Sequence, residues 1–153
     1  MRNHTLNVSD KNVIVTGPTS GIGEQLAVGF GESGSDVTCV EMNLEEARKK
    51  AHEIDELGRR AIAIDTDVAD PDRVAVMVDR VTEKFGRIDV LQHYAGINIQ
   101  GDAEAFDLAA WEKVIKVKLA EIFFCDKAVG KQMIEKALVE ASLTCRLFVR
   151  RTS

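Results

Sequence analysis

A glycine-rich segment near the N-terminus has the composition and spacing of an anion-binding turn. Residues 16–23 read Thr-Gly-Pro-Thr-Ser-Gly-Ile-Gly and lie between an apolar run and a helical pattern. The first glycine allows a tight turn, the second lets backbone approach phosphates, and the third lets the helix pack closely. The helix start would direct N–H groups and a positive dipole end at the anion. The predicted pyrophosphate-binding residues are Gly17, Thr19, Ser20, Gly21, Ile22 and Gly23.

An acidic residue follows the glycine turn at the distance that nucleotide recognition requires. Glu41 ends the next apolar run and lies 18 residues beyond Gly23. A carboxylate about 20 residues after such a turn accepts hydrogen bonds from the adenosine ribose hydroxyls. It would also repel a 2′-phosphate, and neither Met42 nor Ser20 is basic. These residues predict NAD rather than NADP as the cofactor, and the alternative is that Glu41 is only a solvated acid at a strand end.

Strand-like and helix-like segments alternate along the whole chain, and this alternation would position the turn and the acid. Strands are expected at residues 12–16, 36–41, 61–67 and 89–95, and helices at 21–32, 44–57, 71–85 and from 108 to about 142. The last helix is long enough that a break is expected, with Gly130 as one candidate. Residues 147–149 form a candidate fifth strand. The pattern predicts an α/β fold, a Rossmann-type doubly wound parallel sheet of four to five strands with helices on both faces.

Length, charge and hydrophobicity indicate a single domain that binds neither nucleic acid nor membranes. The chain has 153 residues, which suits one domain spanning residues 1–153, and 45% are hydrophobic. A net charge of −5 argues against a nucleic-acid-binding surface. No apolar stretch is long enough to cross a membrane, and the first residues lack the apolar core of a signal peptide. We therefore expect no nucleic-acid or membrane partner, and a cytoplasmic location.

The cysteines and histidines give no sign of a metal site. They are far apart and have none of the paired spacings of metal ligands, so the cysteines are predicted to be reduced thiols, mainly in the core. The residues concerned are Cys39, Cys125, Cys145, His4, His52 and His93.

With these features in place, the chain resembles the short-chain dehydrogenase/reductase family over roughly residues 11–136. Residues 16–23 match the family's Thr-Gly-x-x-x-Gly-x-Gly motif, and residues 85–91 and 111–119 follow its later pattern. The resemblance implies hydride transfer between NAD and a carbonyl or alcohol substrate. Residues 137–153 do not resemble the family. The resemblance adds four residues to the predicted cofactor site, namely Asp67, Val68, Ala95 and Gly96.

The resemblance does not extend to the family's catalytic residues. The Tyr-x-x-x-Lys pair is missing, because Tyr94 is the only tyrosine and position 98 is Asn. His93 and Tyr94 stand where the family has two asparagines, and Lys118 replaces another. His93, Tyr94 and Lys118 are candidate catalytic substitutes, although neighbouring strand residues cannot both face one site. The chain is thus an enzyme with reduced or unconventional activity, or a non-catalytic module that binds adenine dinucleotides.

Self-association is a further expectation. A chain with only the nucleotide-binding half of the family's fold would leave a sheet edge and an apolar helix face uncovered. We expect a homo-oligomer that forms through the helix at 108–142 or through an exposed sheet edge. The alternative is that the apolar stripe of this helix belongs to the internal core or that the chain is a fragment stable only as an oligomer. A small-molecule substrate is expected if the protein is active.

Overall fold

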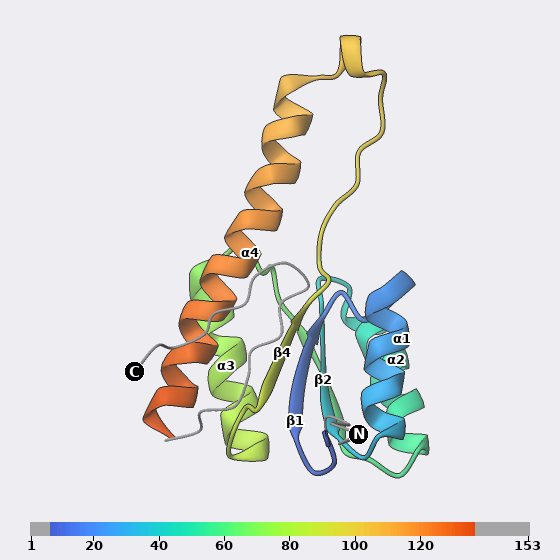
Figure 1. Cartoon of the computed structure of the whole chain (residues 1–153), viewed down its shortest axis with the longest axis vertical. Coiled ribbons are helices and arrows are strands. Elements are labelled where there is room, and N and C mark those ends of the chain that lie inside the picture. Colours follow the sequence, from blue (N-terminus) through green and yellow to red (C-terminus); the bar gives the residue numbers. More distant parts are fainter. Residues whose placement is uncertain (1–6, 137–153) are drawn as a thin grey trace, which may run out of the picture.

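Four parallel strands form the centre of the protein. The computed structural model describes residues 7–136 and contains β1 (Asn12–Thr16), β2 (Asp36–Glu41), β3 (Ala61–Asp65) and β4 (Val90–His93). They are hydrogen-bonded in the order β3-β2-β1-β4 (Figure 1). The chain therefore builds outward from β1 to β3 and then crosses to the other side of β1. This confirms the predicted doubly wound parallel sheet, while the candidate strand at 147–149 lies outside the described residues.

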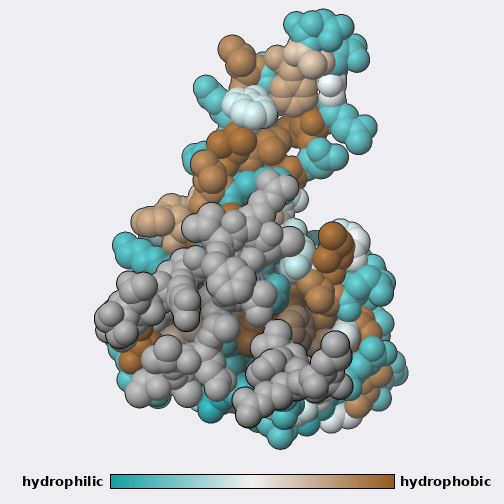
Figure 2. All heavy atoms as spheres, in the orientation of Figure 1, coloured by the Kyte–Doolittle hydropathy of each residue, from teal (hydrophilic) through white to brown (hydrophobic). Residues whose placement is uncertain are grey.

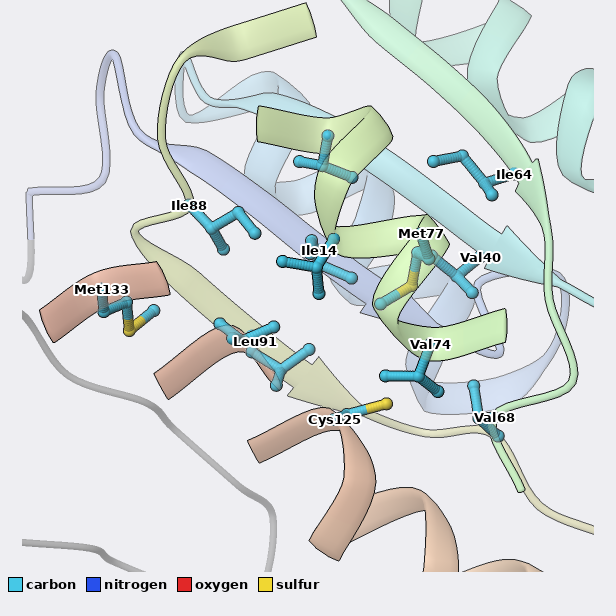
Figure 3. Packing of buried hydrophobic residues seen from close by; sticks show 13 residues of the cluster. Ile14, Val40, Ile64, Val68, Val74, Met77, Ile88, Leu91, Cys125 and Met133 are labelled. Carbon is cyan, nitrogen blue, oxygen red and sulfur yellow. The ribbon is translucent and has the colours of Figure 1, made fainter. Parts of the chain in front are cut away.

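Helices cover both faces of the sheet, as predicted. On one face, α1 (Gly21–Glu32) and α2 (Leu44–Glu56) pack against Val13, Val15 and other alternate strand residues. On the other face, α3 (Pro71–Phe85) and α4 (Leu108–Glu135) pack against Ile14 and Leu91 (Figure 3). Successive strand residues point to opposite faces, so the continuous apolar runs supply two separate cores.

Local chemistry explains where the helices begin. The side chains of Asn43, Asp70 and Asp107 accept hydrogen bonds from the first N–H groups of α2, α3 and α4. Gly86 ends α3 in the left-handed conformation, with φ at 81°. The strands β3 and β4 are shorter than the predicted 61–67 and 89–95, because pairing with their neighbours ends at Asp65 and His93.

Helix α4 extends well beyond the sheet. It is continuous over 28 residues, so the break predicted at Gly130 is wrong. Val129 and Met133, on either side of that glycine, are both buried in the core and hold the helix there. The first half of α4 rises past the strands together with the preceding loop, which contains the 3₁₀ helix η1 (Ala103–Ala105) (Figure 1). The predicted end near residue 142 falls outside the described residues.

The described cysteines are core thiols, as predicted. Cys39 and Cys125 are both free and buried, and burial raises the pKa of Cys39 to about 12. Cys145 lies outside the described residues. Within residues 7–136 no group of three metal-binding side chains comes together, and none of the helices has the length and hydrophobicity needed to cross a membrane.

Candidate functional site

The glycine turn between β1 and α1 lies directly against the chain that leaves β4. A Cβ atom on Gly17 would come within 2.7 Å of the backbone nitrogen of Ala95, and Gly17 has a φ of +65°. A Cβ atom on Gly23 would lie 2.1 Å from the carbonyl oxygen of Gly17 and 2.9 Å from Cβ of Tyr94. Both positions therefore require glycine. The close approach brings the turn and residues 94–96 together at the carboxyl end of the sheet, where the strand order reverses.

The start of α1 is open to an incoming group. Ser20 occupies the N-cap position, but its side chain makes no capping hydrogen bond, unlike the caps of the other three described α-helices. A Cβ atom on Gly21 would have no neighbour within 4 Å, and Ile22 is 65% exposed. The first N–H groups of a helix need acceptors from outside the helix. Backbone donors, a positive dipole end and open space fit a pyrophosphate.

Glu41 lies beside this turn. It ends β2, next to β1 in the sheet, and its carboxylate accepts a hydrogen bond from the Thr19 hydroxyl at 3.1 Å. It also accepts from the backbone N–H of Met42 at 2.9 Å. The Glu41 carboxylate is thus fixed at the turn rather than extended into solvent. Its remaining acceptor capacity fits the hydroxyl groups of a ribose.

Asp67 and Val68 follow β3 and are placed differently from each other. The side chain of Val68 is buried in the core on the α3–α4 side. The carboxylate of Asp67 accepts from the backbone N–H of Ala69 at 2.9 Å, which stabilises the turn before α3. Asp67 and the backbone are therefore the parts of this pair that a ligand could reach.

His93 and Tyr94 point to opposite faces of the sheet. Tyr94 packs against the core under α1 and α2, whereas His93 is buried on the α4 side. Nε2 of His93 lies 2.9 Å from Oδ1 of Asp126, and Nδ1 lies 3.6 Å from Oε1 of Glu121. Burial alone would lower the pKa of His93, but the two carboxylates outweigh burial and raise it to about 9. His93 is therefore a buried cation at neutral pH.

Lys118 reaches the end of β4 from helix α4. Its ammonium lies over Gly96, where a Cβ atom would come within 2.7 Å of Nζ. Of the three candidate catalytic substitutes, only the side chain of Lys118 is seen to reach Gly96. Tyr94 directs its side chain toward α1 and α2, and His93 is buried on the α4 side. A cation stands there in place of the family's asparagine.

Glu121 was missed by sequence reasoning. It is 2% exposed, and it accepts a short hydrogen bond from the hydroxyl of Thr16 at the end of β1. A signal did exist, because position 121 has helical spacing with the buried Cys125 and Val129. A carboxylate on an apolar helix face needs a partner, and a histidine ending a buried strand needs one as well.

Comparisons with known proteins show what the chain is similar to. A sequence model described as short chain dehydrogenase matches residues 11–139. The chain is 30% identical over 133 residues to 2-dehydro-3-deoxy-D-gluconate 5-dehydrogenase of Dickeya dadantii, covering 87% of this chain and 52% of that protein. It is 35% identical over 127 residues to D-threitol dehydrogenase of Mycolicibacterium smegmatis, covering 82% and 48%. The chain thus spans about half the length of these relatives.

A solved structure shows the same arrangement. The crystal structure of NAD⁺-bound xylitol dehydrogenase superimposes with a TM-score of 0.84 at 27% identity, covering 90% of this chain and 53% of that one.

Proposed function

This chain belongs to the short-chain dehydrogenase family, and we propose that it binds NAD at the carboxyl end of its sheet for oxidoreduction of a carbonyl or alcohol. The observation that carries the proposal is the uncapped start of α1 beside the fixed carboxylate of Glu41. The first fits a pyrophosphate and the second fits the ribose of the same ligand. When bound, the nicotinamide would supply the hydride acceptor or donor.

The preference for NAD over NADP is part of the proposal. A 2′-phosphate would stand on the ribose that Glu41 is placed to bind, and two negative groups at that distance repel. The neighbouring side chain, Met42, is 69% exposed and carries no charge to offset the repulsion. The buried free thiols of Cys39 and Cys125 suit a reducing compartment, and we place the protein in the cytoplasm.

Catalysis by this chain alone would be reduced or unconventional. The family's Tyr-x-x-x-Lys pair is absent from the sequence. Lys118 places an ammonium over Gly96, where it could hold a ligand's hydroxyl or lower the pKa of a nearby acid. Tyr94 is the only phenol of the chain, and its side chain packs toward α1 and α2. These two residues are the candidates for any remaining proton transfer.

A non-catalytic nucleotide-binding module is the second candidate function. It is favoured by the placement of His93, which both carboxylates hold on the buried side of β4, away from the predicted site. In this case the protein senses or sequesters an adenine nucleotide, and the adenosine half of the ligand supplies most of the affinity.

We also propose that the chain self-associates through α4. Leu108, Trp111, Leu119 and Phe123 recur at helical spacing on one face of the helix, and all four are exposed. Figure 2 shows hydrophobic surface over this part of the molecule, where α4 rises above the sheet. A second copy of the chain would cover this face with an identical apolar stripe.

Calorimetric titration with NADH, NADPH and ADP tests the proposal. We expect NADH to bind, and to bind more tightly than NADPH. A much higher affinity for NADH than for ADP would indicate a nicotinamide subsite and favour the enzyme. Equal affinities would favour the non-catalytic module, and the absence of binding by all three would refute the site.

An activity assay tests the catalytic part separately. NADH consumption with a panel of ketones and aldehydes should be slow, and Lys118→Ala and Tyr94→Phe should lower it. Unchanged rates in both variants would remove these residues from the proposed chemistry.

A further inference from the structure

A buried series of polar contacts runs from α4 to the glycine turn. Thr16 and His93 are register partners at the carboxyl ends of β1 and β4, and Glu121 of α4 contacts both. The Thr16 hydroxyl donates to Oε1 of Glu121, and the same oxygen lies 3.6 Å from Nδ1 of His93. The side chains of His93 and Glu121 are each only 3% exposed. Charges this deeply buried persist only when they compensate one another.

Glu121 determines the orientation of the Thr16 hydroxyl. A hydroxyl group has one proton to donate and two lone pairs with which to accept. With its proton directed at Glu121, Thr16 accepts from the backbone N–H of Tyr94 at 3.0 Å and of Ala95 at 3.2 Å. The carbonyl of Gln92, at 3.3 Å, is a more distant acceptor for the same proton. Every hydrogen-bonding position of the hydroxyl is then used.

The backbone that Thr16 holds is also the backbone that touches the glycine turn. Added Cβ atoms on Gly17 and Gly23 would collide with Tyr94, and one on Gly17 would also meet Ala95. The position of residues 94 and 95 therefore sets the shape of the turn. Glu121 acts on the turn through Thr16, without touching the predicted ligand position itself.

His93 compensates the charge of Glu121. The charged groups that act on its ring are Glu121 and Asp126, both on α4. On β1 its neighbour is the uncharged Thr16. The nearby thiol of Cys125 is neutral, since burial raises its pKa. A deprotonated His93 would leave the buried carboxylate of Glu121 without an opposite charge.

We propose that Glu121 is a positioning residue for the dinucleotide site and that His93 holds its carboxylate in place. The inference rests on the proposed nucleotide site. The packing of α4 against the sheet and the geometry of the glycine turn are then coupled, so that a substitution at a buried residue of α4 alters nucleotide affinity.

The test compares Glu121→Gln with Glu112→Gln, an exposed residue of the same helix that undergoes the same change of charge. Calorimetry with ADP on the full chain, well below the unfolding temperature, should show roughly tenfold weaker binding for Glu121→Gln. Glu112→Gln should bind like the unmodified chain. The double variant Glu121→Gln with His93→Asn should bind ADP like Glu121→Gln alone, because His93 acts on the glycine turn only through the carboxylate of Glu121.

A pH series from about 7 to about 10 gives a readout that a merely structural role would not change. Affinity for ADP should fall as the pH rises through about 9, and in Glu121→Gln this fall should be absent, because no carboxylate is left for His93 to hold. Equal ADP affinities for Glu121→Gln and the unmodified chain, with only a lower melting temperature, would overturn the inference. No binding of ADP or NAD by the unmodified chain would instead refute the nucleotide site itself, and the inference with it.

Discussion

Nε2 of His93 lies 2.9 Å from Oδ1 of Asp126, and this contact joins the end of β4 to helix α4. The side chain of His93 is 3% exposed, so the histidine end of this pair is buried. A protonated imidazole is favoured there, and the pKa of His93 rises from 6.5 to about 9. The stability of the fold is therefore linked to pH.

The stability should fall on the alkaline side. The unfolded chain releases this proton near pH 6.5 and the folded chain near pH 9. The contribution is thus complete below pH 6.5, declines between the two values and is lost above pH 9. At low pH the protonated His93 contributes about 3 kcal/mol to the free energy of unfolding. Urea unfolding across this range measures it. His93→Gln should remove the dependence, whereas His52→Gln, at an exposed position, should retain it.

Replacing Glu41 should change the choice of cofactor. Glu41→Gln keeps the size of the side chain and its contact with Thr19, but it removes the charge that repels a 2′-phosphate. We expect the affinity for NADPH relative to NADH to rise roughly tenfold. Glu32→Gln, at the opposite end of α1, is the control. An unchanged ratio in calorimetric titrations would mean that Glu41 does not face the ribose.

Two glycines of α1 should respond in opposite ways to the same substitution. In Gly23→Ala the new Cβ would lie 2.1 Å from the Gly17 carbonyl oxygen, so the turn must shift at a cost of roughly 1–3 kcal/mol. Gly29→Ala meets no atom within 4 Å and should stabilise the helix by up to about 1 kcal/mol. Thermal unfolding measures both. A stable Gly23→Ala protein with normal nucleotide affinity would contradict the tight turn.

Self-association should depend on the exposed face of α4. The double substitution Leu119→Lys and Phe123→Lys would place two charges in the proposed contact between copies. The dissociation constant of the homo-oligomer should then rise more than about tenfold. Val76→Lys, at an exposed apolar residue of α3, should leave association unchanged. Sedimentation equilibrium at micromolar concentrations distinguishes the cases. A monomeric unmodified chain would refute the interface.

Local signals predicted those elements whose ends depend on local chemistry. The bounds of β1, α1, β2 and α3 agree with the structure; for α3, Asp70 caps the first turn, Pro71 suits the first helical position and Gly86 ends the helix. Strand ends depend on neighbours, so β3 and β4 stop where pairing with Glu41 and Thr16 stops. Gly130 failed as a break because packing in the core outweighs its low helix propensity.

Some residues of the candidate site could also be predicted from local sequence, and others could not. The glycine turn follows β1 and Glu41 ends β2, so the hydrogen bond between Thr19 and Glu41 follows from the parallel pairing of these neighbouring strands. Glu121 is 105 residues from Thr16, and its role depends on how α4 crosses the sheet. Only the folded arrangement brings that carboxylate under the ends of two strands.

The extension of α4 beyond the sheet has a consequence for local opening. Its 28 residues span about 42 Å, whereas a strand of six residues spans about 20 Å. Val129 and Met133 anchor the second half, while Trp111 and Leu119 in the first half remain exposed. No residue of α4 before Glu121 is buried, and an isolated helical segment of this length is only marginally stable in water. In the monomer, amide hydrogen exchange should therefore be slow near Val129 and fast near Trp111, a gradient of protection along one unbroken helix.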